Sequence, residues 1–588
     1  MSSFPQIGFL AAERPRKHAK PKKLHSGVAA TDSINIPDSD CLLRFDSGRA
    51  LTFAQGARSS LVIGGTGSGK TRSVLLPAAR NLLRAGYGGY IPDYKGNLRT
   101  QIRAIAADCG RLDDIVEFGT SATACPTNLL AGMQDHEIAD LLNTMAITGV
   151  QSDYNVSWHQ KGVKLGCDVL HALSDISSIC RRTEFAKKFT PTLLKLYVCM
   201  TNHTLARGLW AYYTHLLETS VEKRRNCRGA MPDYLRRAQS FFHQVSAEHF
   251  HVMTDPKKFK NLGSSGTTQY MQQLSWMTER LVRMLRLMHT THGMLRQFSC
   301  DDDRSVPMDF DKLVYGQRKI VLVHFPLDSA EAGAIIARIA KERFYQAVLR
   351  NGLDASGYTF MLGDEFQDIC DLDPTSRMND MQFFSVSREF RNINLIASQS
   401  IASLRANKSA NAVTSLIGNC MTKIILQCGD PETMQWVSSY RPAGYGIKLL
   451  RRGACYLECF TQDGNSLSTM DMVNDAYQGV EAVLRNTPHD HAEALQDGSC
   501  DTGQSGLPYL VETLLMRMAD SPELADDAAE WLDRMREASK KGLPCWDESG
   551  WEECERKKSF RRRRDKENEK CRREERRRSW ANRDRREN

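Results

Sequence analysis

The residues with the clearest chemical meaning form a glycine-rich run that ends in a lysine and a threonine. The run fits the pattern Gly-x-x-x-x-Gly-Lys-Thr and consists of Gly64, Gly65, Thr66, Gly67, Ser68, Gly69, Lys70 and Thr71. Glycines let a backbone turn around an anion with its N–H groups inward, and a helix that starts at the lysine adds a positive terminal dipole. The lysine suits the β- and γ-phosphates of a nucleotide, and the threonine hydroxyl suits Mg²⁺. The run therefore predicts a phosphate-binding loop for ATP with Mg²⁺.

A site of this kind needs a second carboxylate at the end of a neighbouring strand. Residues 358–362 are apolar enough for a strand, and Asp364 and Glu365 follow it directly after a glycine. We expect Asp364 to hold Mg²⁺ through water and Glu365 to polarise the attacking water. Residues 93–96, Asp-Tyr-Lys-Gly, follow another predicted strand, and an ordinary β-turn explains them equally well.

Strand and helix patterns alternate around these motifs. Short apolar runs predict strands at 60–63, 87–92, 319–323, 358–362, 393–397 and 423–427. Helical patterns at 71–84 and 330–349 follow two of these runs. Such alternation is typical of a parallel sheet with helices on its faces, so we predict an α/β fold.

The middle of the chain departs from that pattern. Between about 133 and 300 helical periodicity dominates, with candidate helices at 159–173, 193–217, 232–249 and 270–287. We interpret this region as an all-α insertion that splits one nucleotide-binding core. The predicted divisions are a flexible basic N-terminal arm at 1–45, the core at 46–132 and 301–475, the insertion at 133–300, a helical segment at 476–550, and a charged basic tail at 551–588.

The composition bounds the class of protein. The chain has 588 residues, of which 41% are hydrophobic and 25% charged, as expected for a globular protein of several domains. No stretch approaches the roughly 18 consecutive apolar residues of a membrane span, and no apolar segment follows the basic start as in a signal peptide. The 17 cysteines include no Cys-x-x-Cys pair, which favours a reduced, cytoplasmic compartment.

The net charge of +9 is concentrated at the two ends of the chain. Residues 552–588 carry +7 and residues 1–25 carry +5, which leaves −3 for the rest. The tail also places Glu569 and Glu574 four positions before Arg573 and Arg578, the order that supports a helix. Two interpretations of the tail stay open: a solvated charged helix, and a docking segment for nucleic acid or an acidic partner.

Together, the motifs resemble the type IV secretion coupling proteins of the TraG/TraD group. The resemblance rests on residues 64–71, 93–96, 364–367, 387–388 and 398–400, with further agreement at 418–420 and 430–433. It covers roughly residues 50–475, and the helical insertion lies where that family has its all-α domain. It implies a RecA-like, hexameric ATPase that brings single-stranded DNA with its relaxase, or protein effectors, to a secretion channel.

The resemblance also implies roles for individual residues. Gln399 resembles the family's sensor of the γ-phosphate, although a polar strand end is the plain alternative. Arg388 matches the arginine that reaches the ATP of the neighbouring subunit, and a guanidinium suits this role because it stays charged and bridges two phosphate oxygens. Arg391 could do the same, and either side chain could simply be a solvated arginine. The implied catalytic set is Glu365, Gln399 and Arg388.

Members of that family usually start with transmembrane helices, and this sequence shows none. The resemblance then implies either a soluble variant or a chain that a separate membrane-anchoring protein recruits, in the cytoplasm or at the inner face of a bacterial membrane. The implied partners are single-stranded DNA or a DNA–relaxase complex, secretion-channel proteins, and further copies in a homo-hexamer. Two alternatives stay open: a DNA-translocating ATPase without a secretion role, and a weakly hydrolysing, ATP-gated substrate adaptor.

Overall fold

A computed structural model describes residues 40–486 of the chain. The gaps lie at 94–95, 97, 122, 148–155, 182–188, 202, 226–230, 247–262, 292, 326–329, 374–377, 407, 441–443, 461–465 and 474–475. Most of the predicted N-terminal arm, the segment from 487 to 550 and the charged tail lie outside the described residues.

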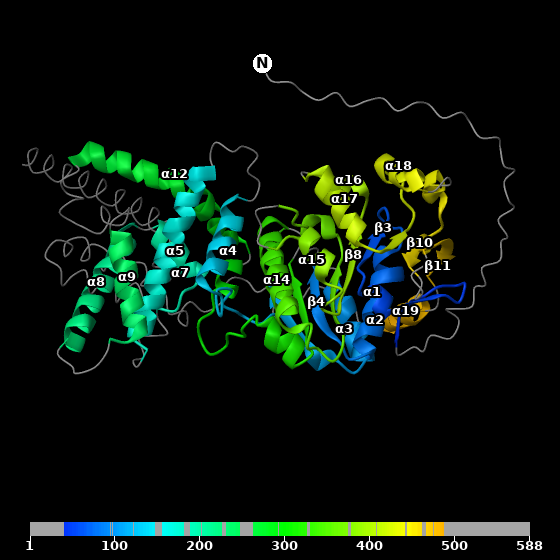
Figure 1. Ribbon diagram of the computed structural model, residues 1–588, viewed down its shortest axis with the longest axis horizontal. Coiled ribbons are helices and arrows are strands. Elements are labelled where there is room, and N and C mark those ends of the chain that lie inside the picture. Colours follow the sequence, from blue (N-terminus) through cyan, green and yellow to red (C-terminus); the bar gives the residue numbers. More distant parts are fainter. Residues whose placement is uncertain are drawn as a thin grey trace, which may run out of the picture.

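One nine-stranded sheet forms the centre of the molecule (Figure 1). Its strands are β3 (Ser60–Ile63), β4 (Gly88–Asp93), β5 (Ile115–Gly119), β6 (Ile320–His324), β7 (Thr359–Gly363), β8 (Asn392–Ser398), β9 (Thr422–Ile425), β10 (Ala454–Phe460) and β11 (Ser466–Met472). The spatial order is β11-β10-β9-β3-β8-β7-β4-β6-β5. All pairs are parallel except those of β10 with β9 and β11.

This mostly parallel sheet confirms the predicted α/β class. The six strands expected from the sequence are all present, and β3, which leads into the glycine-rich run, lies between β8 and β9. Strand β5 and the hairpin of β10 and β11 are additional strands that the apolar runs did not reveal.

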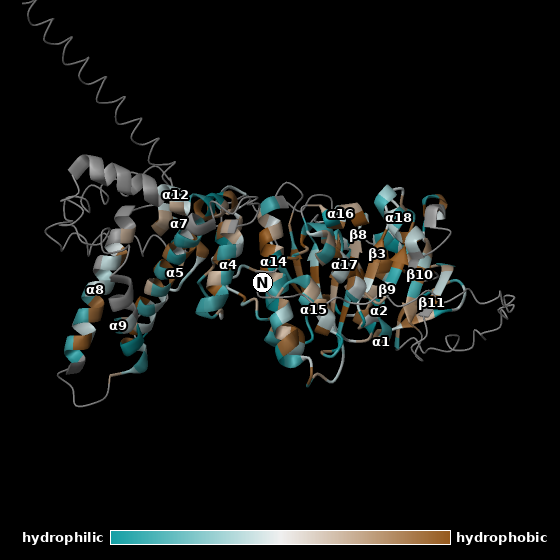
Figure 2. Cartoon of the chain, turned by 45° about the horizontal axis from the view of Figure 1, so that its top comes forward, coloured by the Kyte–Doolittle hydropathy of each residue, from teal (hydrophilic) through white to brown (hydrophobic). Residues whose placement is uncertain are grey.

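Alternate residues along the strands face two separate hydrophobic cores. In β3, Leu61 and Ile63 pack into one core and Val62 into the other, and all three are buried. Figure 2 shows β3 and β8 as apolar strands in the interior. Because both faces of the sheet are apolar, helices must cover both.

One face carries α14 (Ala330–Asn351), α15 (Asp380–Val386), α16 (Ile401–Arg405) and α17 (Ala410–Asn419). The other face carries α1 (Phe53–Gly56), η2 (Lys70–Leu75), α2 (Leu76–Arg84), α3 (Leu98–Asp108) and α19 (Ala476–Asn486). The helix expected at 71–84 is thus divided into the π-helical turn η2 and the α-helix α2. Helix α19 packs against η2, α2 and α3, so the chain returns to the glycine-rich run before residue 487.

A short antiparallel pair, β1 (Cys41–Arg44) and β2 (Ala50–Thr52), lies beside α2. Leu42 and Leu43 are fully buried there, and Phe45 forms a bridge with Val473. Residues 41–45, which the sequence placed in the N-terminal arm, are therefore part of the core in the structure.

The helical region lies to the left of the sheet in Figure 1. Its helices are α4 (Asp135–Ile147), α5 (Val156–Ile179), α7 (Leu193–Thr201), α8 (His203–Arg225), α9 (Asp233–Ser246), α12 (Gly263–Thr290) and α13 (Met294–Gln297). The single helix expected at 193–217 is two helices, α7 and α8. In the described part of the chain no named strand falls between β5 and β6, which are neighbours in the sheet, so the insertion leaves the core at its β5 edge.

Backbone hydrogen bonds close the neck of this insertion. Thr127 N–H donates to the carbonyl of Gln297 at 2.8 Å, and Leu129 N–H donates to that of Phe298 at 3.0 Å. A buried ion pair between Lys195 and Asp301, 2.6 Å apart, fixes α7 to the returning chain. The two ends of the insertion are therefore held side by side.

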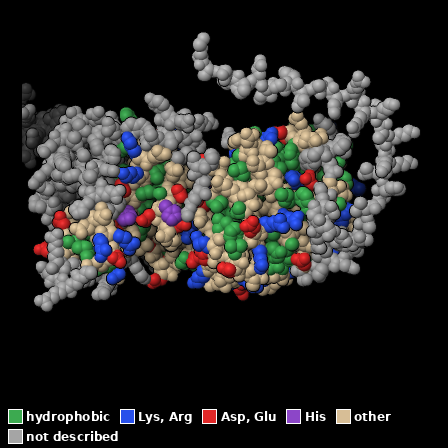
Figure 3. Space-filling view, viewed as in Figure 1, with side chains coloured by type: hydrophobic (Ala, Val, Ile, Leu, Met, Phe, Trp, Pro, Cys, Tyr) green, Lys and Arg blue, Asp and Glu red, His purple; other side chains and the backbone are tan. Residues whose placement is uncertain are grey.

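The remaining elements are short connections and one further helix. They are η3 (Leu112–Asp114), η5 (Asp311–Gly316), η7 (Phe366–Asp368), α18 (Pro431–Tyr440) and η8 (Gly444–Leu449). Among the described residues, no helix combines the length and the apolar character needed to cross a bilayer. On the face of the core seen in Figure 3, side chains of both charge signs are interspersed.

Candidate functional site

The glycine-rich run forms the turn between β3 and η2, at the carboxyl edge of the parallel strands. A cavity of about 460 Å³ opens there. The residues that line it are Thr66, Gly67, Gly69, Lys70, Thr71, Arg72, Pro92, Asp93, Leu98, Gln101, Asp364, Glu365 and Arg452. Sequence-predicted residues from two distant motifs thus share one cavity, as expected of parallel strands that end at one edge.

Lys70 is buried at the start of η2, with its ammonium group turned toward the loop that precedes it. The Nζ atom donates to the carbonyl of Gly64 at 2.6 Å and lies 3.4 Å from that of Gly65. Gly69 has a φ of +102°, a left-handed conformation that favours glycine, and this turn directs the chain into η2. The lysine charge and the helix start therefore face the same cavity.

Thr71 and Asp364 are in direct contact. Thr71 Oγ1 donates to Asp364 Oδ2 at 2.6 Å. Burial raises the pKa of Asp364, and the charge of Glu365 adds to this, while the Thr71 hydroxyl and Lys70 oppose it. A hydroxyl and a buried carboxylate are hard oxygen ligands of the kind Mg²⁺ binds through one or two protein groups. The pair therefore fits the predicted metal site.

The described part of the chain offers no competing metal centre. No group of three or more His, Cys, Asp or Glu side chains there could hold a metal ion. Cys455 and Cys459, whose residue types are those of metal ligands, are buried in the hydrophobic core instead.

Glu365 follows Asp364 in a sharp turn. Its φ of +47° is left-handed, which costs a non-glycine residue of order 1–3 kcal/mol. Its N–H donates to Asp364 Oδ1 at 2.9 Å, and its Oε2 accepts from Gln367 Nε2 at 2.6 Å. The turn keeps both carboxylates in the cavity lining, and Gln367 orients the one that is expected to act on water.

The motif at 93–96 does more than form a turn. Asp93 is buried at the end of β4, and its Oδ2 accepts the backbone N–H groups of Leu98 and Arg99, each at 2.8 Å. These bonds cap the first turn of α3. Asp93 and Leu98 both line the cavity, so this cap fixes one wall of the candidate site. Lys95 lies outside the described residues.

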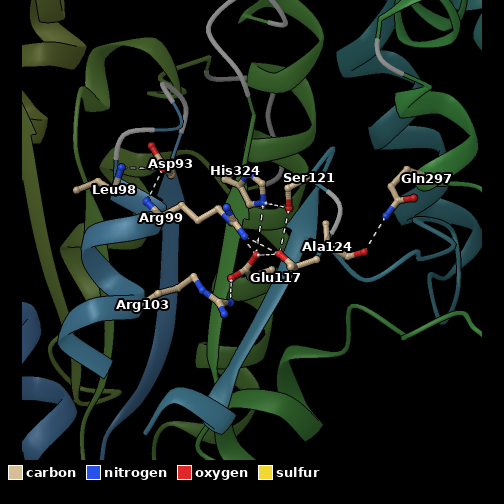
Figure 4. A network of polar contacts seen from close by, with 10 residues as sticks. Asp93, Leu98, Arg99, Arg103, Glu117, Ser121, Ala124, Gln297 and His324 are labelled. Carbon is tan, nitrogen blue, oxygen red and sulfur yellow. Dashed lines mark hydrogen bonds and ion pairs between the residues drawn. The ribbon is translucent and has the colours of Figure 1, made fainter. Parts of the chain in front are cut away.

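A buried polar network continues from α3 to β5 and β6 (Figure 4). Arg99 Nε donates to Glu117 Oε2 at 2.8 Å, and Arg103 donates to Glu117 Oε1 at 2.5 Å. Burial alone would raise the pKa of Glu117, but the hydrogen bonds from Arg99, Arg103 and Thr123 outweigh it and hold that pKa below its usual range. The carboxylate therefore stays charged and anchors α3 to the sheet.

Gln399 lies beside the loop but outside the cavity lining. It follows β8, which lies between β3 and β7, and the carbonyl of Ser398 accepts the N–H of Gly64 at 3.2 Å. Gln399 is half-buried, and its carbonyl accepts a weak bond from Cys428 Sγ at 3.7 Å. Its role as a γ-phosphate sensor stays a prediction.

Arg388 is far from the cavity of its own chain. It precedes the amino end of β8, whereas the glycine-rich run follows the carboxyl end of the parallel strand β3. The seven residues of β8 span about 20 Å, so the two lie at opposite edges of the sheet. Arg388 and Arg391 are both exposed, and the guanidinium of Arg391 also donates to the carbonyl of Ala355 at 2.8 Å. The role of either arginine at the ATP of a neighbouring subunit stays a prediction.

Besides Pro92 and Leu98, three polar cavity residues were not identified from the sequence. Gln101 belongs to α3, and its Oε1 is buried with no hydrogen-bond partner among the described residues. Arg72 follows the glycine-rich run directly, and its guanidinium pairs with Glu481 of α19 at 3.1 Å. Arg452 comes from the turn before β10. Neither Gln101 nor Arg452 belongs to a motif. Nothing in the sequence therefore indicates that these residues share a cavity with Lys70.

Comparison with known proteins gave one family match. Residues 359–441 match the family model described as the TraM recognition site of TraD and TraG. This match confirms the resemblance to coupling proteins over the region that holds Asp364, Glu365, Arg388 and Gln399. A search of curated proteins gave no match.

Solved structures of similar shape include a plasmid coupling protein and VirB4. The plasmid coupling protein TrwB in complex with ADP and Mg²⁺ is 12% identical, with a TM-score of 0.47, and the match covers 74% of this chain and 90% of that one. VirB4 of Thermoanaerobacter pseudethanolicus is 12% identical, with a TM-score of 0.39, and the match covers 75% of this chain and 98% of that one.

Proposed function

We propose that this chain is an ATPase of the coupling-protein type, which hydrolyses ATP to ADP and phosphate to drive DNA or protein substrates to a type IV secretion channel. The observation that carries the proposal is the 2.6 Å contact of Thr71 with Asp364 inside a cavity that Lys70 and Glu365 also line. A phosphate-binding loop and a second strand end thus meet where a nucleotide and its metal would bind.

Four side chains that line the cavity, Lys70, Thr71, Asp364 and Glu365, each have a task in the proposed reaction. Lys70 binds the phosphate chain, and the backbone N–H groups of the loop orient it. Glu365 accepts a proton from the attacking water, and Gln367 holds the carboxylate in position. Mg²⁺ held by Thr71 and Asp364 would neutralise charge on the β- and γ-phosphates.

The position of Arg388 supports a site shared between subunits. Because Arg388 lies at the sheet edge away from its own cavity, it serves ATP only if another copy places it there. A head-to-tail ring gives one such composite site at each contact, and the proposed assembly is a homo-hexamer. Gln399, at the end of β8, would report the state of the γ-phosphate to the same interface.

The proposed partners follow from the family match. Residues 359–441 match a region named for recognition of TraM, which supports binding of a TraM-like partner by this part of the chain. We assign single-stranded DNA, or DNA bound to a relaxase, as the cargo, with secretion-channel proteins as the receiving partners. A membrane-anchoring partner would place the chain at the inner face of the membrane.

The decisive test separates nucleotide binding from hydrolysis. Lys70→Ala is expected to weaken ATP binding and abolish turnover, because it removes the charge nearest the phosphates. Glu365→Gln is expected to bind ATP normally and to lower turnover by about 10²- to 10⁴-fold, the usual contribution of a general base. Isothermal titration with ATP and Mg²⁺, together with phosphate release, measures both quantities.

Glu389→Gln is the matched control, because Glu389 is exposed and lies outside the cavity. It is expected to behave as the parent protein. Parent-like turnover in Glu365→Gln would contradict the assignment of Glu365. ATP binding without turnover in the parent protein, in the presence of single-stranded DNA, would favour the adaptor function.

A further inference from the structure

We infer that Arg452 is a second cationic contact for the phosphate chain of the nucleotide, supplied by the same subunit as Lys70. This inference rests on the proposed function and assigns a further binding residue to it. Arg452 lies far along the chain from the glycine-rich run and belongs to none of the motifs that predict the site, yet it lines the cavity.

A turn attached to the phosphate-binding loop holds Arg452 in place. The turn connects η8 with β10. Gly453 N–H donates to the carbonyl of Ser68 at 3.3 Å, and the carbonyl of Gly453 accepts the N–H of Val473 at 3.2 Å. Gly453 has a φ of +83°, so the turn requires glycine directly after the arginine. The backbone of the turn therefore bridges the loop and the end of β11.

The side chain of Arg452 packs against the phosphate-binding loop near its base. Its Cγ atom lies 3.3 Å from the position that a Cβ atom on Gly69 would take. The absence of a side chain at Gly69 thus leaves room for the stem of the arginine, at the point where the loop enters η2. Arg452 therefore both packs against the loop and lines the cavity.

The two arginines of the cavity differ in their charge partners. Arg72 forms a two-pronged ion pair with Glu481, with N–O distances of 3.1 and 3.3 Å. Arg452 is exposed and makes no ion pair with the residues that the structure describes. Its charge is therefore available to an anion, whereas that of Arg72 is already compensated.

The charged groups that line the cavity indicate which class of ligand Arg452 would bind. Asp364 and Glu365 line it together with Asp93, and Lys70 and Arg452 add cationic groups to the same lining. A guanidinium binds two phosphate oxygens in parallel and stays charged throughout the pH range. The expected ligand of Arg452 is the phosphate chain of a nucleoside di- or triphosphate.

The experiment compares Arg452→Ala with Arg451→Ala in the full-length chain. Arg451 is exposed in the same turn and does not line the cavity, so it matches the charge and location of Arg452. Calorimetric titration with ATP and Mg²⁺ is expected to show affinity about 10- to 100-fold weaker for Arg452→Ala and unchanged for Arg451→Ala. The affinity of Arg452→Ala for pyrophosphate, which lacks the base and the ribose, is expected to fall by a similar factor.

Two additional variants distinguish the possible failures. Arg452→Lys is expected to recover part of the lost affinity, since it keeps a charge but not the planar fork. Equal affinity of the two alanine variants for ATP, or an unchanged affinity for pyrophosphate, would overturn the inference while leaving the proposed function intact. If the parent protein and Lys70→Ala both fail to bind ATP, the proposed function itself fails.

Discussion

Thr71 and Asp364 are 293 positions apart in sequence, and their side chains meet at 2.6 Å. The contact joins the part of the core before the insertion to the part after it. Thr71 belongs to η2 and Asp364 follows β7, so the candidate metal site exists only when both parts have assembled on one sheet.

The buried carboxylate of Asp364 is expected to destabilise the nucleotide-free protein. Its folded pKa is raised above 3.8, chiefly by burial, so this penalty is absent below pH 3.8 and develops as pH rises through the folded pKa. Asp364→Asn should therefore raise the melting temperature at pH 7 and abolish turnover. Thermal unfolding without nucleotide measures the gain, which should shrink at lower pH. Asp113→Asn, at an exposed position, should leave the melting temperature unchanged.

The carboxylate of Glu117 is expected to have the opposite effect and to stabilise the folded protein at neutral pH. Its folded pKa lies below 4.5 because the hydrogen bonds from Arg99, Arg103 and Thr123 outweigh burial, so its stabilising effect is full above pH 4.5 and is lost as pH falls through the folded pKa. Glu117→Gln leaves Arg99 without its buried partner and should lower the free energy of unfolding at pH 7 by about 3 kcal/mol. Urea unfolding over a pH series measures this.

The control for Glu117→Gln is Asp108→Asn. Asp108 pairs with Arg80 and Arg84 on a more exposed part of the same layer. An exposed pair contributes about 0–1 kcal/mol, so this change should have a small effect. Equal losses for the two variants would mean that the network around Glu117 does not anchor α3.

Arg388→Ala tests the shared site. ATP binding should stay nearly intact, and turnover should fall by about 10³-fold or more if the arginine reaches the ATP of a neighbouring subunit. Arg391→Ala is the matched comparison: it removes the hydrogen bond to Ala355 and should cost about 1 kcal/mol of stability without this loss of turnover. Steady-state phosphate release and ATP titration give both numbers.

Mixing Arg388→Ala with Lys70→Ala subunits should restore part of the activity, since each variant supplies what the other lacks. The mixed assembly must be verified by tagging the two variants differently. Absence of rescue at every ratio would show that one chain contains the whole site.

Deletion of residues 552–588 tests how DNA is engaged. The tail carries +7, so binding through the tail alone would give a salt dependence with a slope of about −0.7 per phosphate neutralised, and the deletion would remove it. We expect instead that ATPase stimulation by single-stranded DNA persists after the deletion, because a motor must couple ATP to its own core. ATPase rates over a salt series decide this; loss of stimulation in a folded, active deletion variant would contradict it.

The strands that the sequence predicted are short, mostly apolar runs, whereas each strand that it missed lacks this signal for a local reason. Strand β5 carries Glu117 at its centre, and only the contacts with Arg99 and Arg103 make that charge acceptable in a buried strand. Strand β10 alternates buried Cys455, Leu457 and Cys459 with more exposed residues, a weak signal because two of the inward residues are cysteines.

The residues of the candidate site also fall into those that the sequence predicts and those that it does not. Lys70, Thr71, Asp364 and Glu365 were predictable because fixed spacing and a preceding strand place them at one sheet edge. Arg452 was not predictable, since the turn that holds it depends on bonds from Gly453 to Ser68 and Val473. The same holds for the ion pair of Arg72 with Glu481, which requires the return of α19.

The strand order also determines when the strands of the sheet can pair during synthesis of the chain. Strands β3, β4 and β5 leave the ribosome first, yet none of them pairs with another, because their partners are β6, β7, β8 and β9. At about 5–20 residues per second, β3 waits roughly 20–70 s for β8. The insertion, whose neck closes on itself, can become compact during that interval. The first half of the nascent core therefore contains three unpaired strands for much of its translation, and this is when it is most prone to aggregation and most in need of a chaperone.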